Sequence, residues 1–286
     1  MTAVKSLLLF LDTIKVSHSV FALPFAVAAL FMACGGLPPP GLLGKVVLAV
    51  VFARTAAMSF NRWADATIDA ENPRTRGRAV PAGLLSRRAV GAASIISAAG
   101  FVAVAAWIND LALALSPIVL VILLGYSYTK RFTALSHVIL GAALGLSPLG
   151  AWVAARGEVA LPPLVLGLAV LFWTAGFDVI YACQDRDFDV GRGLHSIPAR
   201  LGVARALLLA RTFHALALAL LAALGWTAGF GAAYWAGVGC VAALLAYEHS
   251  IVSPGDLSRV NVAFFTLNGL VSLVFMAAVV IETLGR

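Results

Sequence analysis

Residues 42–83 read LLGKVVLAVVFARTAAMSFNRWADATIDAENPRTRGRAVPAG, an apolar run that ends in a cluster of charged residues. The apolar run has about the 20 residues that an α-helix needs to cross a bilayer. Similar runs recur along the whole chain, which is 62% hydrophobic and 12% charged, with a mean hydropathy of +0.98. These values lie far outside the range of soluble domains, so the sequence predicts an all-α, polytopic membrane protein.

The apolar runs predict about nine transmembrane helices. They cover residues 14–34, 42–66, 88–108, 111–129, 136–155, 161–184, 203–225, 230–250 and 260–283. Each run is continuous and does not alternate with polar residues, which favours helices over the strands of a barrel. No short apolar stretch with a cleavage site precedes the first run, so we expect no cleaved signal peptide.

Basic residues are concentrated on one side of the predicted helices. With the N-terminus in the cytoplasm, the cytoplasmic side receives Lys5, Lys15, Arg74, Arg76, Arg78, Arg87, Arg88, Lys130, Arg131, Arg186, Arg192, Arg200, Arg205 and Arg259. The opposite side receives only Lys45, Arg156 and Arg286. This distribution follows the positive-inside rule and predicts a multi-pass protein of the inner cell membrane with its charged loops in the cytoplasm. The net charge of +7 is explained by this topology and by an anionic ligand, so no nucleic-acid partner is expected.

Two sets of polar residues predict an internal repeat. Within each set the members are four residues apart, and the second set follows the first after 120 residues: Asn61, Asp65 and Asp69, then Tyr181, Asp185 and Asp189. We therefore expect one domain over residues 1–286, with four-helix pseudo-repeats at about 1–132 and 133–255 and a ninth helix at about 256–286. Parallel repeats of this kind are predicted to surround a central cavity, with the binding site between the halves.

A spacing of four residues places each set on one face of a helix, at its cytoplasmic end. Like charges at this spacing repel, and carboxylates oppose the dipole at a helix C-terminus, so a positive partner is required. Carboxylate oxygens suit Mg²⁺, which commonly links one or two carboxylates to substrate phosphates. The predicted metal ligands are Asn61, Asp65, Asp69, Asp185 and Asp189, and the four aspartates are the predicted catalytic residues.

Basic side chains near the two sets suit phosphate oxygens. The predicted diphosphate-binding residues are Arg62, Arg74, Arg78, Lys130 and Arg131. Carboxylates for a metal and cations for phosphate, both at the mouth of an apolar bundle, predict a lipid diphosphate as the ligand. Its head would lie on the metal and its tail among the helices.

The two charged stretches resemble the signature motifs of a known family. NRWADATIDAENPRTRGRAVPAG, residues 61–83, resembles the first aspartate-rich motif of the UbiA superfamily of intramembrane prenyltransferases, and YACQDRDFDVGRGLHSIPARLG, residues 181–202, is similar to the second. The resemblance extends to IKVSHSVFALPF at residues 14–25 and to YSYTKRFT at residues 126–133. It is strongest to bacterial 4-hydroxybenzoate polyprenyltransferase-like proteins, including the futalosine-route menaquinone branch.

The resemblance implies an Mg²⁺-dependent enzyme of ubiquinone or menaquinone biosynthesis. It would transfer a polyprenyl group from an allylic polyprenyl diphosphate to a small aromatic acid, either 4-hydroxybenzoate or a dihydroxynaphthoate. The sequence departs from the family pattern at Arg62, where the family frequently has its first aspartate, and at Gln184, where it usually has lysine. Both departures leave the four aspartates intact, so we expect them to affect diphosphate binding more than the chemistry.

Three further residues are predicted to bind the acceptor. Arg54 and Asp178 each lie seven residues before a motif, about two turns deeper in the membrane, where ionisable residues are functional candidates. Arg54 is predicted to hold the carboxylate of the acceptor, and Asp178 is either a base for its phenol or the ion-pair partner of Arg54. Tyr181 either orients the second set of aspartates or is an interfacial tyrosine.

The alternative function is a membrane transporter or binding protein that uses the same aspartates for a cation or a lipid diphosphate. A transporter would place these aspartates at mid-depth, whereas the sequence places them at the cytoplasmic mouth. A CDP-alcohol phosphatidyltransferase would carry a D-G-x-x-A-R signature, which this sequence lacks.

Overall fold

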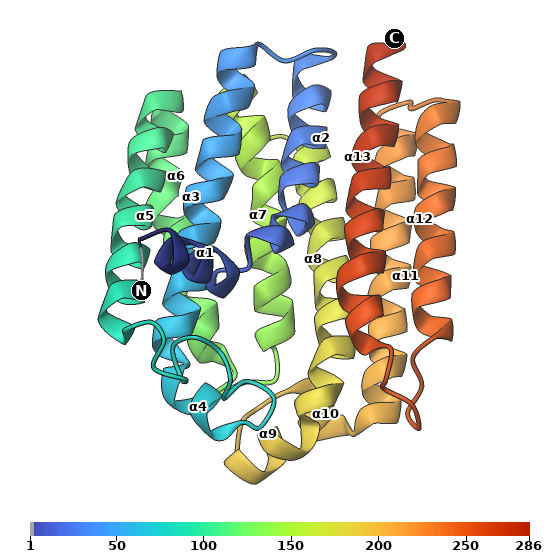
Figure 1. The fold of residues 1–286 in the computed structure, drawn as a ribbon. Helices are drawn as coiled ribbons and strands as arrows, with labels where there is room; N and C mark the ends of the chain where they lie inside the picture. Colours follow the sequence, from blue (N-terminus) through green and yellow to red (C-terminus); the bar gives the residue numbers. More distant parts are fainter. Residues whose placement is uncertain (1–2) are drawn as a thin grey trace.

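The computed structural model describes residues 3–286, together with the side chains of residues 8–15 and 19–286. The described chain is a bundle of roughly parallel and antiparallel helices (Figure 1). Outside the helices and turns it contains one isolated bridge, between Ser253 and Asp256. The prediction of an all-α membrane fold is confirmed.

The first half of the chain contains five long helices and three short ones. In chain order they are α1 (Ala3–Thr13), the 3₁₀ helix η1 (Val16–Phe21), α2 (Leu23–Cys34), α3 (Pro40–Ala64), α4 (Ala66–Glu71), α5 (Arg87–Ile108), α6 (Asp110–Thr129) and α7 (Ser136–Arg156). Side-chain caps fix where two of them begin, because Ser86 accepts from the backbone N–H of Ala89 and Asn109 accepts from that of Ala112. Asn109 therefore makes the sharp break that separates α5 from α6.

The second half contains four long helices joined by short ones. They are α8 (Leu161–Ala182), the 3₁₀ helix η2 (Cys183–Asp185), α9 (Arg186–Arg192), α10 (Ile197–Leu201), α11 (Val203–Thr227), α12 (Ala232–Ser250), the π-helix η3 (Val262–Leu267) and α13 (Asn268–Leu284). Glu282 of α13 accepts the backbone N–H of Gly231 at 2.7 Å, which caps the first turn of α12 from a neighbouring helix.

Helices occupy all nine predicted apolar runs, but the number of transmembrane helices is not settled at nine. Seven segments of the described chain are long and apolar enough to span a bilayer: Pro40–Ala64, Arg87–Ile108, Asp110–Thr129, Ser136–Arg156, Leu161–Arg192, Val203–Thr227 and Val262–Leu284. The two predicted runs that are not among these seven are the first and the eighth. The first forms a shorter apolar helix, and the eighth forms α12, which carries Glu248 and His249 near its end.

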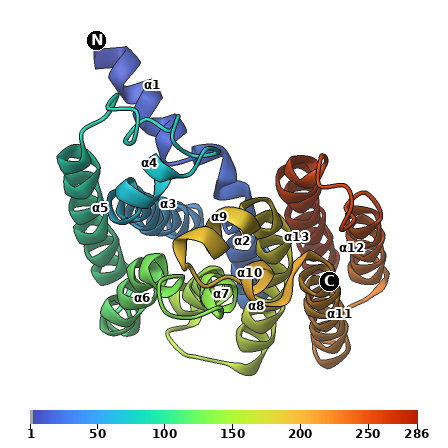
Figure 2. The same ribbon diagram turned by 90° about the horizontal axis from the view of Figure 1, so that it is seen from below.

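The short helices α4, α9 and α10 lie together at one end of the bundle, at the bottom of Figure 1. Seen from this end, α2, α7 and α8 lie in the middle of the bundle, and α1 extends away from it (Figure 2). Helix α3 packs on α5 and α6. Helix α7 packs on α2 and α8, and α8 also packs on α11. Helix α13 packs on both α12 and α2. The end that carries α4, α9 and α10 is called the charged end below, because both aspartate sets lie there.

Helices α7 and α8 are in backbone contact at the middle of the bundle. A Cβ atom on Gly145 would lie 2.5 Å from the carbonyl oxygen of Gly167, and one on Gly141 would lie 2.3 Å from that of Leu171. Any larger residue at Gly141 or Gly145 would force the two helices apart, as expected for small residues spaced four apart on a membrane helix. This close contact leaves no room for a ligand between α7 and α8.

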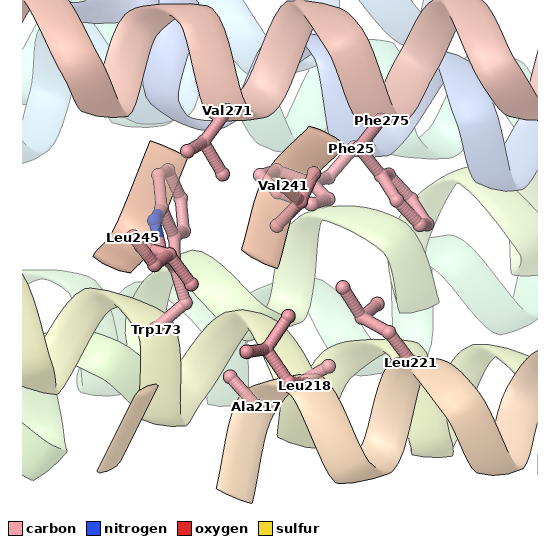
Figure 3. A pocket seen from close by; sticks show the side chains of 10 residues that line it. Phe25, Trp173, Ala217, Leu218, Leu221, Val241, Leu245, Val271 and Phe275 are labelled. Atoms are coloured by element: carbon pink, nitrogen blue, oxygen red, sulfur yellow. The ribbon is translucent and has the colours of Figure 1, made fainter. Parts of the chain in front are cut away.

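The main cavity has a volume of about 330 Å³, and its walls come from α3, α5, α6 and α7. Helix α7 belongs to the second predicted repeat, whereas α3, α5 and α6 belong to the first, so residues of both repeats line the cavity. In another part of the bundle, α2, α8, α11, α12 and α13 close around a space of only about 10 Å³. Figure 3 shows that this space is lined by hydrocarbon side chains such as Phe25, Leu221 and Phe275, with the Trp173 indole at one side.

Candidate active site

Both aspartate sets lie where a long helix breaks. The spacing predicts a continuous helix through each set, but α3 ends just before Asp65 (φ −91°, ψ 3°) and α9 begins just after Asp185 (φ −99°, ψ 1°). The two residues thus share one backbone conformation at equivalent helix ends. In the first set, backbone hydrogen bonds from Asp65 to Asn61 (2.9 Å) and from Asp69 to Asp65 (2.8 Å) keep the helical path across the break. The three side chains therefore still follow one side of the chain.

Asp65 is surrounded by hydrogen-bond donors although it is almost completely buried. Lys130 Nζ lies 2.7 Å from its Oδ2, and Arg131 Nη2 lies 3.2 Å from its Oδ1. The side-chain amide of Asn61 donates to Oδ2 at 3.0 Å. The turn between α6 and α7 thus supplies two positive charges to a carboxylate that is 2% exposed, which is how a buried charge is tolerated.

Asp69 pairs with a different pair of cations. Arg78 Nη1 donates to both carboxylate oxygens at 2.9 Å, and Arg62 Nη1 lies 3.8 Å from Oδ2. The Arg62 guanidinium is itself buried, and its Nε donates to the backbone carbonyl of Thr13 at 3.1 Å. Arg62 therefore fixes the end of α1 to α3, which leaves it less accessible to a ligand than the other predicted phosphate-binding residues.

Asp185 joins the second aspartate set to the loop that follows the first. The side-chain amide of Asn72 donates to its Oδ1 at 3.0 Å, and the Arg74 guanidinium donates to both oxygens. Arg74 also donates to the Tyr181 hydroxyl at 2.8 Å and lies 5.0 Å from the centre of the Tyr181 ring. Burial lowers the pKa of Arg74, but the hydrogen bond to Asp185 and the nearby negative charges outweigh it and raise that pKa. Arg74 therefore stays a cation.

Asp189 has no cation within ion-pair distance among the described side chains. It lies beside Ser196, with Lys130 and His137 in electrostatic range. The described residues include no group of three or more His, Cys, Asp or Glu side chains arranged to hold a metal ion. The charged end thus carries four separate carboxylates, those of Asp65, Asp69, Asp185 and Asp189. These carboxylates and the cations beside them are called the rim below. Asp65, Asp69 and Asp185 lie opposite cations, and Asp189 is the least neutralised.

Arg54 and Tyr126 line the main cavity, on the two helices, α3 and α6, whose ends reach the charged end. Arg54 Nη2 donates to the Lys15 carbonyl at 3.2 Å, but its buried Nε has no hydrogen-bond partner. Tyr126 lies within electrostatic range of Asp65, Arg62, Asp178 and Arg54. A buried N–H without a partner is costly, which makes this end of the cavity a place where an anionic group would be stabilised.

Of the two alternatives for Asp178, the ion pair with Arg54 is not found among the described side chains. Asp178 Oδ2 lies 2.7 Å from Nδ1 of His137. Helix α3 packs on α5, α6 and α2, whereas α8 packs on α7 and α11. The partner of Asp178 therefore comes from α7, which lies next to α8.

Four residues of this region were not predicted as site residues: Asn72, Tyr126, His137 and Ser196. Asn72 and Tyr126 lie inside the two quoted stretches 61–83 and 126–133, so position in those stretches was the available signal. His137, in the first turn of α7, pairs with Asp178 of α8. Its partner is 41 residues away, and no local pattern marks such a contact.

Comparison with known proteins identifies the family. The model of the UbiA prenyltransferase family matches residues 22–270. A 4-hydroxybenzoate octaprenyltransferase from Ralstonia nicotianae is 31% identical over 254 residues, which covers 87% of this chain and 86% of the relative. A 4-hydroxybenzoate octaprenyltransferase from Xanthomonas campestris pv. campestris is 36% identical over 229 residues, which covers 78% of this chain and 74% of the relative.

Solved structures agree with this assignment. The apo structure of a UbiA homolog from Aeropyrum pernix superposes with a TM-score of 0.85 at 35% identity, covering 93% of this chain and 98% of the other. A UbiA homolog from Archaeoglobus fulgidus, solved bound to GPP and Mg²⁺, has a TM-score of 0.73 at 21% identity. The match covers 97% of this chain and 100% of the homolog. At that identity the second likeness shows the fold alone.

The prediction of an enzyme, and not a transporter, is confirmed by these relatives. The family model covers most of the chain, and the two relatives, 31% and 36% identical, match 87% and 78% of it. The chain is therefore an integral membrane enzyme and belongs to the UbiA prenyltransferase family.

Proposed function

We propose that this enzyme transfers a polyprenyl group from an allylic polyprenyl diphosphate to a small aromatic acid, with Mg²⁺ as cofactor, in quinone biosynthesis. One observation carries the proposal: α3 and α6, which lead into the aspartates and cations of the rim, also line an apolar cavity of about 330 Å³, with Arg54 and Tyr126 among the lining residues. A diphosphate head suits the rim, and isoprene units suit the cavity. The activity named for the relatives, prenylation of 4-hydroxybenzoate, supports this reading and favours a benzoate over a naphthoate.

The rim residues fit Mg²⁺ in the way that this ion binds with a substrate phosphate. Mg²⁺ keeps several waters and usually takes one or two carboxylates plus phosphate oxygens, so it does not need three protein ligands in one group. Asp65 and Asp69 would offer oxygens from one side and Asp185 and Asp189 from the other, with Asn61 next to Asp65. Mg²⁺ bound there would supply positive charge to the leaving diphosphate.

The cations of the rim would bind the diphosphate directly. The side chains of Arg74, Arg78, Lys130 and Arg131 are 29% to 33% exposed, so each can turn from its aspartate toward a phosphate. Arg62 stays buried, so its role is to hold Asp69 and the end of α1. Positive groups fixed around the leaving group stabilise the negative charge that develops as the allylic C–O bond breaks.

The cavity would protect the allylic carbon after that bond breaks. Its lining is almost entirely apolar, so water is kept from the carbocation. The diphosphate leaves with the bonding electron pair, and an electron-rich ring carbon of the acceptor supplies the pair for the new C–C bond. The ring then loses one proton and becomes aromatic again.

The acceptor carboxylate is proposed to bind Arg54, so Arg54→Lys is expected to raise the KM for the acceptor by about tenfold or more. Lysine keeps the positive charge but loses the planar pair of donors that matches a carboxylate, and the free Nε of Arg54 is lost with it. The KM for the prenyl diphosphate should change little. Steady-state kinetics with each substrate varied in turn measures both constants, and an unchanged acceptor KM would contradict the assignment.

A panel of acceptors tests the proposed substrate class. Membranes that contain the enzyme are incubated with radiolabelled polyprenyl diphosphate and with 4-hydroxybenzoate, 1,4-dihydroxy-2-naphthoate, or the matching phenols without a carboxylate. We expect labelled product from a carboxylated acceptor and far less from its decarboxylated analogue. Equal use of both would reject the aromatic acid as the acceptor class.

The charged end is proposed to face the cytoplasm, as the distribution of basic residues requires. In a background with Cys34, Cys183 and Cys240 replaced by alanine, Gly77→Cys and Gly191→Cys should be labelled by a membrane-impermeant thiol reagent only from the cytoplasmic side. Both positions are exposed at the charged end: Gly77 lies in the loop after α4, and Gly191 lies in the last turn of α9. The control Glu158→Cys, at the opposite end of α7, should be labelled only from outside, and the reverse pattern would invert the topology.

A further inference from the structure

A glutamate without a role in the chemistry described so far lies deep in the C-terminal half of the bundle. Glu248 of α12 is 0% exposed, and its Oε1 accepts a hydrogen bond from the Asn268 amide at 2.9 Å. Its Oε2 has no hydrogen-bond partner among the described residues. His214 Nδ1 lies 4.0 Å from this oxygen and is bonded instead to His249 Nε2 at 2.9 Å. A fully buried carboxylate is costly, which makes Glu248 a functional candidate.

Asn268, the partner of Glu248, lies where the π-helix η3 meets α13. Its side-chain nitrogen also donates to the Ala263 carbonyl, five residues earlier in η3, at 2.9 Å. Its side-chain oxygen accepts from the Trp173 indole N–H of α8 at 2.7 Å. Because the indole can only donate and the carbonyl can only accept, the amide is held in one orientation. Asn268 thus ties η3 to both α8 and α12, and Glu248 holds the amide from the α12 side.

The π-helix carries an aromatic side chain to the charged end. The rings of Phe264 in η3 and Tyr181 in α8 have centroids 4.2 Å apart, with their planes tilted by 32°. The Tyr181 hydroxyl accepts from Arg74 Nη1 at 2.8 Å, and Arg74 donates to both oxygens of Asp185. A π-turn is rare within helices and frequently marks a functional site. A continuous series of contacts therefore joins η3 to the rim.

We propose that Glu248 and Asn268 form a clamp, and that both are positioning residues for the diphosphate site. The clamp holds η3 in its π-helical turn, η3 holds the Tyr181 ring through Phe264, and the Tyr181 hydroxyl holds Arg74 in the rim. The inference rests on the proposed prenyl transfer, in which Arg74 binds the diphosphate. A site whose groups are held in place before the ligand arrives loses less entropy on binding. The clamp therefore increases the affinity for the prenyl diphosphate.

The clamp is expected to act on one substrate and not on the other. Its residues belong to α12 and α13, whereas Arg54, the proposed ligand of the acceptor, lies on α3. Neither Glu248 nor Asn268 is among the described residues that line the main cavity. Loss of the clamp should therefore raise the KM for the prenyl diphosphate and leave the KM for the acceptor near its wild-type value.

Steady-state kinetics of purified variants in lipid nanodiscs test this expectation. Glu248→Leu, which has a similar size but no acceptor oxygen, should raise the KM for the prenyl diphosphate by about 10- to 100-fold. Glu248→Gln keeps an oxygen for the Asn268 amide and should recover most of that affinity. The matched control is Glu282→Leu, because Glu282 is also a buried glutamate that joins α12 and α13, but at the end opposite the rim. Both KM values should stay near wild type in this control, and an equal rise there would overturn the assignment.

A double-mutant cycle tests the series of contacts itself. Tyr181→Phe keeps the ring that packs on Phe264 but loses the hydroxyl that Arg74 contacts. If the clamp acts through this hydroxyl, Glu248→Leu should raise the KM for the prenyl diphosphate by no more than about twofold in a Tyr181→Phe background. A clamp that only stabilises the fold would give the same rise in both backgrounds, and that result would contradict the proposal.

Binding of a substrate analogue that does not react separates this inference from the proposed function. In a prenyl thiolodiphosphate, sulfur replaces the bridging oxygen, so calorimetry with Mg²⁺ measures binding without turnover. If the wild-type enzyme binds this analogue and Glu248→Leu binds it equally well, only the clamp fails. If the wild-type enzyme does not bind it, the proposed function fails as well.

A second variant keeps the test decisive if Glu248→Leu does not fold. Phe264→Leu removes the ring that packs on Tyr181 and takes the place of Glu248→Leu in the same cycle. It should raise the KM for the prenyl diphosphate in the wild-type background and change it little in the Tyr181→Phe background. Equal rises in both backgrounds, or no rise in either, would overturn the proposal.

Discussion

Asp65→Asn and Asp185→Asn are each expected to lower the turnover of prenyl transfer by about three orders of magnitude, while folded protein remains in the membrane. Each substitution removes a negative charge from the proposed metal site but keeps the shape of the side chain. It also leaves the opposing cations, Lys130 and Arg131 or Arg74, without their carboxylate. These cations are about one-third exposed, so water can solvate them and the cost to folding should be small. Initial rates at saturating substrates, together with size-exclusion profiles of the variants, measure the two effects.

Asp187→Asn is the matched control for this experiment. Asp187 lies in the same segment as Asp185, but its side chain is 90% exposed and its partner is the neighbouring Arg186. Its carboxylate therefore lies outside the rim, and the variant should keep activity near that of wild type. Turnover close to wild type in Asp65→Asn or Asp185→Asn would contradict the site, and an equal loss in Asp187→Asn would show that the effect is not specific to the rim.

Removal of divalent metal ions is expected to abolish activity completely and reversibly. The rim combines carboxylates with cations and, among its described residues, has no ready three-ligand group, so Mg²⁺ should enter with the diphosphate and be lost to EDTA. Added Mg²⁺ in excess of EDTA should restore the rate, and Ca²⁺, which prefers more ligands at longer distances, should restore much less. Product formation measured in EDTA, and again after each addition, tests this. Turnover that persists in EDTA would rule out the metal.

The sequence was sufficient for the helical regions, and it singled out the charged residues that lie together at the charged end. Hydropathy placed all nine helical regions because each depends on a continuous local run of apolar residues, and the spacing of four brought Asn61, Asp65 and Asp69 onto one side. The break of the helix at Asp65 was not predicted, since the same residues are compatible with a continuous helix. Local patterns thus gave the elements and the residue types, but not the local bends.

Contacts between helices could not be read from local patterns. The pairing of Asn72 with Asp185 spans 113 residues, and that of His137 with Asp178 spans 41. The position of the cavity depends on the close approach of α7 and α8 at Gly145 and Gly167, which periodicity alone does not reveal. Because a residue's position along a helix does not say which helix lies beside it, the sequence left open whether Asp178 pairs with Arg54, and the structure pairs it with His137 of α7.

The most direct test of the account is to measure the transfer itself with purified enzyme. The protein is reconstituted into lipid vesicles with Mg²⁺, octaprenyl diphosphate and 4-hydroxybenzoate, and both the organic product and released diphosphate are quantified by mass spectrometry and by a coupled assay. The account predicts a ring-prenylated hydroxybenzoate and diphosphate in equal amounts, with both formed about three orders of magnitude more slowly by Asp65→Asn. Release of diphosphate without a prenylated acceptor, or no reaction with any aromatic acid and prenyl diphosphate, would contradict it.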